Sequence, residues 1–226
     1  MRASPPSNPH ADHPKPGSPP RRNFAANLWI YYSNKNRQLL RIEGDVPFMH
    51  CVLMEGDPDI VRYTQPAFHE PGGDSSKKVC VTFSIAQDRA GAQVWFGYSR
   101  GKAADPDRRH AAFQDLCRLA GDSGAACRLM TDSELERQRC LFDNWLVLSR
   151  AMTAARSYPR QREAEALAVL LARAPSFELT VALHQPECDP AIMLAIIARQ
   201  LQVGRLTADL KVHLLSASTI VHGSPS

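Results

Sequence analysis

The alternation of hydrophobic and polar positions predicts strands and helices that follow one another along most of the chain. Runs of β-branched and aromatic residues predict four strands, at 27–33, 60–70, 78–87 and 92–100. The DRAGA segment between the last two supplies the glycine of a hairpin. Apolar positions three and four apart predict helices at 46–55, 103–124 and 133–150, with a short buried strand at 126–131. This order indicates an α/β fold in which helices flank a sheet.

Residues typical of helix ends mark several of these boundaries. Pro47 falls in the first turn of the helix predicted at 46–55, where its missing N–H costs nothing. Thr131 or Ser133 can cap the long helix that follows, with a glutamate three residues later to complete a capping box. Gly204 is placed to end the last long helix of the chain in a left-handed conformation.

The pattern changes at Tyr158-Pro159. Beyond this point three helical patterns follow one another, at 162–174, 177–184 and 190–204, and a short segment of mixed polarity closes the chain. Three helices and then a hairpin are typical of a winged helix. We therefore expect a mixed α/β core over residues 24–156 and a small, helical, winged-helix-like domain over residues 157–222.

Composition adds a basic arm to an otherwise ordinary globular protein. The chain has 226 residues with a net charge of +4. Residues 1–23 are rich in Pro, Ser and His and have little to bury, so we expect them to be disordered. Cations outnumber acidic residues strongly up to residue 42, which suits either contact with phosphate or a solubilising tail. No apolar run reaches the length of a membrane span or a signal-peptide core, so we expect a cytoplasmic protein with no membrane partner.

Four stretches together resemble the TnsA-type transposon-end endonuclease family. They are YSNKNRQLLRIEGD (32–45), CVLMEGDPDIVRYTQPAF (51–68), CRLMTDSELERQRCLFDNWLVL (127–148) and LQVGRLTADLKVHLLSASTIV (201–221). Each stretch is degenerate, but their order and spacing agree over about residues 25–222. The resemblance implies a restriction-endonuclease-like mixed sheet flanked by helices, followed by a winged-helix-like domain. It also implies binding to double-stranded DNA, and transposase and ATPase subunits as partners.

The catalytic positions that the resemblance implies are occupied by residues that cannot perform the chemistry. Family members use two carboxylates to hold Mg²⁺, and a strand with the pattern E-x-K beside them, because phosphodiester hydrolysis needs a divalent cation and a positive charge near the transition state. The corresponding residues here are Pro47, Thr82, Trp95 and Gly97. We therefore expect a catalytically degenerate protein with no metal site and no cofactor.

The alternative is a divergent metal-dependent endonuclease whose ligands for Mg²⁺ have moved. The acidic residues near the lost positions are Glu43, Asp45, Asp57 and Asp88. Turn chemistry explains Asp57 and Asp88 equally well, and a helix dipole explains negative charge at the start of the helix after Glu43. Whether the chain is an enzyme stays open on the sequence alone.

The cations expected to contact DNA lie in the basic arm, in the first strand pair and around the last helix. They are Arg21, Arg22, Lys35, Arg37, Arg41, Arg199, Arg205 and Lys211. A solvated surface explains the last three equally well. Three hypotheses result: a non-cutting subunit that holds a transposon end or bridges its partners, a divergent endonuclease, and a free-standing DNA-binding regulator.

Overall fold

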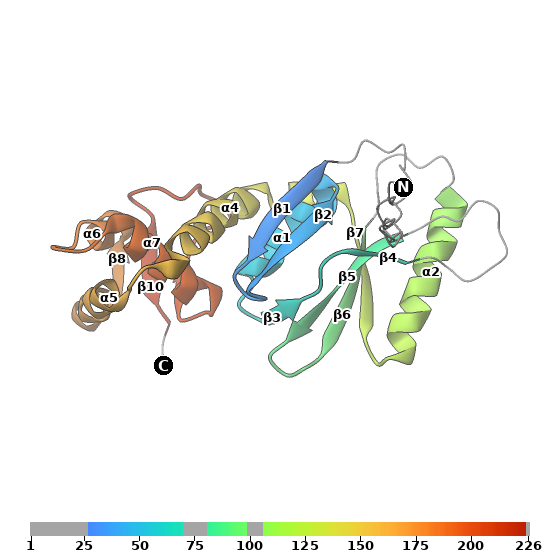
Figure 1. Cartoon of the computed structure of the whole chain (residues 1–226), viewed down its shortest axis with the longest axis horizontal. Helices are drawn as coiled ribbons and strands as arrows, with labels where there is room; N and C mark the ends of the chain where they lie inside the picture. Colours follow the sequence, from blue (N-terminus) through green and yellow to red (C-terminus); the bar gives the residue numbers. More distant parts are fainter. Residues whose placement is uncertain (1–26, 70–80, 99–105, 225–226) are drawn as a thin grey trace, which may run out of the picture.

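The computed structural model describes residues 27–69, 81–98 and 106–224, and shows a mixed α/β protein. The molecule is elongated (Figure 1), with the C-terminal helices at one end, the main sheet toward the other, and a hairpin with its helix between them. The predicted N-terminal arm, including Arg21 and Arg22, lies outside the described residues.

The main sheet has one parallel and several antiparallel pairings. Its strands are β3 (Ile60–Tyr63), β4 (Ala67–His69), β5 (Val81–Asp88), β6 (Gln93–Tyr98) and β7 (Ala126–Met130). The strand order is β3-β5-β6-β7, and β4 also pairs with β5. Only β6 and β7 run parallel among these pairs. The predicted hairpin of β5 and β6 is confirmed, whereas the strand predicted at 60–70 is divided in two before Pro66, which has no N–H to donate to a ladder.

A second, two-stranded sheet lies over one helix. Strands β1 (Leu28–Ser33) and β2 (Gln38–Glu43) form an antiparallel hairpin, and helix α1 (Asp45–Gly56) follows directly. Gly44 joins β2 to α1 with φ of 95°, a conformation that favours glycine. Pro47 lies in the first turn of α1, as predicted.

Helix α1 lies on one face of the main sheet, and helix α2 (Pro106–Asp122) covers the other face. The side chains of Leu116 and Ala112 on α2 are buried with Val81 of β5 in a small second core. Strand β7, predicted to be buried, is mostly exposed. The reason is its place at the edge of the sheet, where only β6 pairs with it.

The helix predicted at 133–150 is two helices in the structure. They are α3 (Asp132–Glu136) and α4 (Arg139–Ala154), and a short 3₁₀ helix, η1 (Ala155–Ser157), extends the second. The predicted capping box is confirmed: the Thr131 side chain accepts from the Glu134 N–H, and the Glu134 carboxylate accepts from the Thr131 N–H.

The C-terminal part combines helices with a small antiparallel sheet. Its elements are α5 (Gln161–Arg173), β8 (Ser176–Glu178), α6 (Leu179–Leu183), α7 (Pro190–Gln202), β9 (Leu206–Ala208) and β10 (Ile220–Gly223). The strand order is β8-β10-β9, so the hairpin predicted after the last helix is present and β8 adds a third strand. Gly204 follows α7 with φ of 75°, as expected of a residue that ends a helix in the left-handed region.

One continuous hydrophobic core joins the two parts of the chain. It includes Leu40 and Val52 beneath the hairpin, Trp145 and Leu148 on α4, and Met193 on α7. Helix α4 packs against both α1 and α7. No described helix combines the length and the apolar character that a membrane span requires.

Candidate functional site

The four positions predicted to have lost catalytic residues do not come together. Thr82 on β5 pairs with Tyr98 on β6, and successive side chains of a strand point to opposite faces. Thr82 and Tyr98 therefore face α1, whereas Trp95 and Gly97 face α2. The β6 residues on the same face as Thr82 are Val94, Phe96 and Tyr98, none of which can bind a metal as a carboxylate does.

A buried neutral network occupies the sheet face that α1 covers. Nδ1 of His50 lies 2.9 Å from the Tyr98 hydroxyl, which also contacts the Ser84 hydroxyl. Burial lowers the pKa of His50 to about 3, so the imidazole is neutral near neutral pH. The ring of His50 also packs edge-on against Phe96. These residues stabilise the interior and bring no charge to it.

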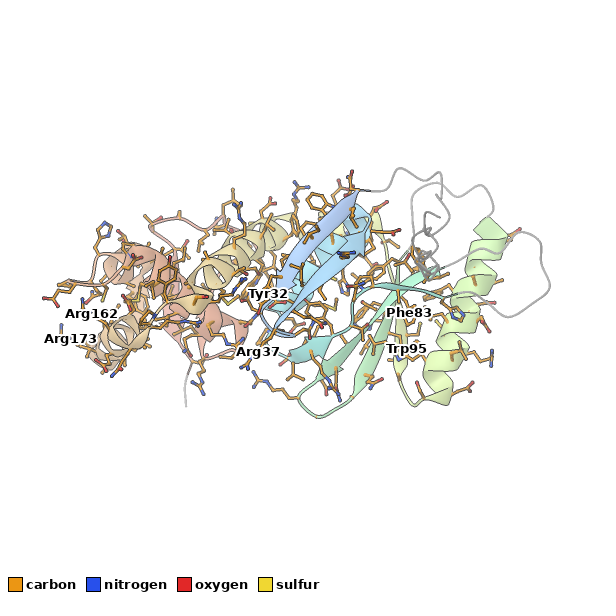
Figure 2. All side chains as sticks on the ribbon, in the orientation of Figure 1. Tyr32, Arg37, Phe83, Trp95, Arg162 and Arg173 are labelled. Carbon is orange, nitrogen blue, oxygen red and sulfur yellow. The ribbon has the colours of Figure 1, made fainter. Side chains whose placement is uncertain are left out.

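The face that α2 covers is filled by packing. The rings of Phe83 and Trp95 stack with their centroids 5.4 Å apart, and Figure 2 shows the two side by side next to α2. A Cβ atom at Gly97 would lie 2.9 Å from the Phe113 ring. Gly97 is thus required for the close approach of α2, and a lysine would not fit there.

Three of the four acidic residues considered as relocated metal ligands accept hydrogen bonds from groups nearby. Asp45 accepts hydrogen bonds from the side chains of Asn27 and Trp29 at the start of α1. Asp57 accepts from the Asp59 N–H, and Asp88 accepts from the N–H at position 92 of the hairpin turn. Within the described residues, no three histidine, cysteine or acidic side chains gather as metal ligands would. Glu43 is the last residue of β2, two positions before Asp45 at the start of α1.

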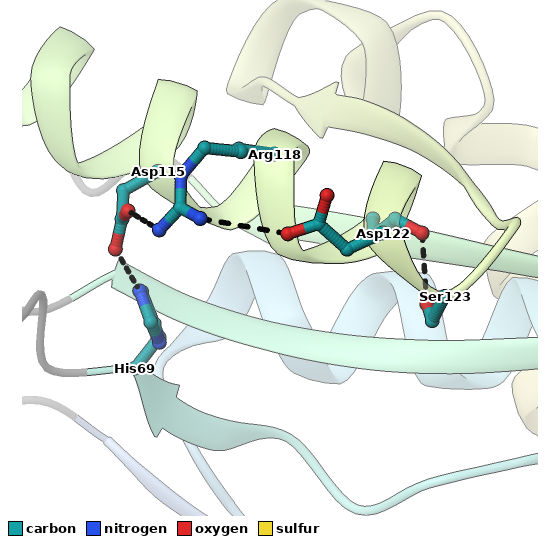
Figure 3. Close-up of polar contacts among 6 residues, drawn as sticks. His69, Asp115, Arg118, Asp122 and Ser123 are labelled. Carbon is teal, nitrogen blue, oxygen red and sulfur yellow. Dashed lines mark hydrogen bonds and ion pairs between the residues drawn. The ribbon is translucent and has the colours of Figure 1, made fainter.

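A histidine–carboxylate pair joins β4 to α2, but it has the features of a structural link. Nε2 of His69 lies 2.9 Å from Asp115, and Asp115 accepts from Arg118 at 2.7 Å (Figure 3). The hydrogen bonds from Arg118 and from His69 lower the pKa of Asp115. Within the described residues no hydroxyl or thiol hydrogen-bonds to His69, so this pair lacks the nucleophile of a hydrolytic triad.

A fully buried carboxylate, Glu55 at the end of α1, ties several elements together. One oxygen accepts from the hydroxyls of Ser33 and Tyr63, at 2.8 and 2.6 Å. The other accepts from the Lys35 N–H at 2.7 Å and from the Gln202 amide at 2.8 Å. These four hydrogen bonds satisfy both carboxylate oxygens, as a buried polar group requires. Glu55, at the end of α1, thereby links the end of α7 to the β1–β2 turn.

Cations from four different segments line a cavity next to this carboxylate, and Glu55 bonds to two other groups of the lining residues, the Lys35 N–H and the Gln202 amide. Lys35 of the β1–β2 turn, Arg89 of the β5–β6 turn, Arg199 of α7 and Arg205 beyond α7 line one cavity of about 440 Å³. The charges of Arg37 and Arg160 also act on Arg199. We call these six residues the basic cluster: Lys35, Arg37, Arg89, Arg160, Arg199 and Arg205.

Hydrogen bonds to uncharged groups hold several of these cations in place. The Lys35 ammonium donates to the backbone carbonyls of Asp57 and Ile60, and Arg89 donates to the Val203 carbonyl at 2.7 Å. Arg199 donates to the side-chain carbonyl of Gln202. Burial lowers the pKa of Lys35 to about 8, against the opposing effect of Glu55 and Asp57.

No ion pair within the described part of the chain involves the basic cluster. Figure 2 shows Arg37 at the tip of the β1–β2 hairpin, beside the C-terminal part. Glu55 and Asp57 act on Lys35, and Glu55 also acts on Arg199, but the six cations outnumber these carboxylates, and an excess of like charge destabilises a fold. Such an arrangement is therefore typical of a site for an anionic ligand.

The structure brings together four of the residues predicted to contact DNA. Lys35, Arg199 and Arg205 line the cavity and Arg37 adjoins it. Lys211 instead borders a larger groove of about 1000 Å³ between α1, β7 and the segment after β9. Arg41 is exposed on β2. The sequence interpretation missed Arg89 and Arg160, which lie far from the others along the chain and join them only in the folded protein.

No family model matches this sequence, and no curated protein is significantly similar to it.

Proposed function

We propose that this protein binds the phosphate backbone of double-stranded DNA through the basic cluster and does not hydrolyse it. One observation carries the proposal: six cations from segments far apart in the sequence gather in one part of the molecule, without an ion pair to any described carboxylate. Lysine and arginine contacts to phosphate supply most of the affinity of proteins for DNA. The resemblance to TnsA-type endonucleases favours DNA over other polyanions.

The absence of hydrolysis in this proposal rests on the residues at the expected catalytic positions. The sheet face beside α1 carries Thr82, Ser84 and Tyr98, with His50 neutral above them. A carboxylate pair that holds a divalent cation is the feature on which the chemistry depends. We propose that the restriction-endonuclease-like scaffold has been retained here as a binding protein. Contacts with transposase and ATPase subunits stay predictions from the resemblance.

In the C-terminal part, the burial of helix α7 favours contact with DNA through the C-terminal end of this helix and disfavours its insertion into the major groove. We propose a winged-helix-like fold for it, because the order α5, β8, α6, α7, β9, β10 is that of winged-helix domains. In DNA-binding members the last helix lies in the major groove and needs one free face. On α7 only Pro190 and Ala191 are exposed, so its C-terminal end, with Arg199 and Arg205, is the part that can reach phosphate.

The test is the salt dependence of binding to a labelled duplex, measured by fluorescence anisotropy between about 50 and about 200 mM salt. If four to six phosphates are contacted, the slope of log affinity against log salt is about −4 to −5. Arg89→Gln should weaken binding to all sequences alike and reduce the slope by about one. Arg173→Gln is the matched control, since Figure 2 shows Arg173 at the far end of the C-terminal helices from Arg37.

Two results would contradict the proposal. An affinity that does not change with salt, or that Arg89→Gln and Arg173→Gln lower equally, would show that the basic cluster does not bind the backbone. Mg²⁺- or Mn²⁺-dependent nicking of plasmid DNA that Asp45→Asn or Asp88→Asn abolishes would show instead that this is a divergent endonuclease.

A further inference from the structure

The cavity within the basic cluster has the size and charge of a site for one phosphate-bearing group. Its volume of about 440 Å³ falls within the range of about 300–1,000 Å³ that is usual for small-ligand sites. Four of the cations line it, and only two carboxylates, Glu55 and Asp57, act on Lys35. The cavity therefore has an excess of positive charge.

Three of the four cations that line the cavity are held by hydrogen bonds before a ligand arrives, and all four keep donors for it. An ammonium has three N–H donors and a guanidinium five. Lys35 uses two of its donors on carbonyls, and Arg89 and Arg199 each use one in the hydrogen bonds described above. The Arg205 side chain makes no hydrogen bond to another described residue. Because the long side chains of Lys35, Arg89 and Arg199 are already held, binding loses less conformational entropy.

The walls of the cavity depend on a close approach of α7 to the β5–β6 turn. Gly204 ends α7, and a Cβ atom there would lie 3.1 Å from Pro58 and 3.6 Å from Nη2 of Arg89. With φ of 75° and no side chain, Gly204 lets the end of α7 and the turn form adjoining walls. The result is a concave site, whereas continuous duplex DNA presents a regular row of phosphates, one for about every 3.4 Å of helix axis on each strand.

We propose that this cavity binds the terminal phosphate monoester at the end of a nucleic-acid strand, an inference that rests on the DNA binding proposed above. A terminal phosphate has a charge of about −1.5 to −2 and three strong acceptor oxygens, whereas an internal phosphodiester has a single charge. Four cations that line one cavity match the higher charge and the third acceptor oxygen of the terminal phosphate better than the single charge of an internal phosphodiester. The basic cluster outside the cavity, Arg37 and Arg160, contacts the adjoining backbone.

Four forms of one stem-loop DNA test this assignment, with the label in the loop and the salt concentration held constant. The forms have a 5′-phosphate end, a 3′-phosphate end, a hydroxyl end, or a covalently closed second loop. We expect one phosphorylated form to bind at least about tenfold more tightly than the hydroxyl and closed forms, as additional charge-assisted hydrogen bonds would produce. The two phosphorylated forms show which strand end the cavity takes.

The cavity itself is tested with Arg205→Gln, and Arg173→Gln serves as control. The preference for the phosphorylated end should fall below about twofold in Arg205→Gln and persist in Arg173→Gln. Equal affinity of all four DNA forms would overturn the inference and leave the proposed DNA binding intact, whereas binding to none of them would overturn both. If thymidine 5′-monophosphate binds as tightly as the phosphorylated stem-loop, the ligand is a free nucleotide and the assignment to a strand end is wrong.

Discussion

Replacing His50 with asparagine should make the stability of this protein less sensitive to acid. His50 is buried and its pKa is lowered to about 3, while an unfolded chain has a histidine pKa near 6.5. Between these two values the unfolded chain binds a proton that the folded protein does not. The free energy of unfolding therefore falls as the pH falls from about 6.5 toward 3.

The size of the effect follows from the two pKa values. Relative to neutral pH, His50 should lower the free energy of unfolding by about 1.4 kcal/mol at about pH 5.5 and by about 2.7 kcal/mol at about pH 4.5. An asparagine at position 50 keeps a polar atom near the former Nδ1 position, within reach of Tyr98, and does not titrate. The variant will be less stable at neutral pH, because the side chain is smaller.

The assay is urea unfolding of both proteins at about pH 7.5, 5.5 and 4.5. The stability difference between them should shrink as the pH falls, by about the amounts above. Comparing the two proteins cancels the contribution of Asp45 and Asp115, whose lowered pKa values also make the fold less stable as the pH falls through them. His222→Asn, the same substitution at an exposed position on β10, is the matched control. A difference between wild type and His50→Asn that stays constant with pH would refute the buried neutral imidazole.

Three further substitutions test the packing around the candidate site. Glu55→Gln should destabilise the fold by about 2–4 kcal/mol in urea unfolding, since the two donors on one of its oxygens then face an amide N–H₂. The control Glu165→Gln, at an exposed position, should change stability by less than about 0.5 kcal/mol. Gly97→Ala should cost about 1–3 kcal/mol through the clash with Phe113. Gly121→Ala, where nothing lies within 4 Å, should stabilise α2 by about 0.4–1 kcal/mol. Equal effects of the two glycine substitutions would contradict the packing of α2.

The features that the sequence predicted correctly depend on neighbouring residues. The capping box of Thr131 and Glu134, the hairpin turn of DRAGA and the left-handed Gly204 each need only a few consecutive residues. By contrast, nothing local marks the break between α3 and α4, because neither glycine nor proline lies near Arg137 and Gln138. The exposure of β7 also depends on which strand pairs with it.

The candidate site was predictable only in part, since it is assembled from distant segments. Lys35, Arg199 and Arg205 were identified as cations that suit phosphate contact, but no pattern along the chain shows that they share one cavity. Arg89 follows Asp88 in a hairpin turn and had no local signal of function. For the same reason the faces of Trp95 and Gly97 became clear only once the pairing of β5 with β6 was known.

The single core shared by the two parts of the chain has a consequence for how this protein unfolds. Trp145 and Leu148 of α4 are buried together with Met193 of α7, so removing residues beyond 157 would expose a large apolar surface on α4. We expect one cooperative transition in calorimetry and in denaturant, with no separately stable fragment. Deletion variants would therefore report loss of folding whatever the function of the deleted part, and assigning a role to either part requires point substitutions in the intact chain.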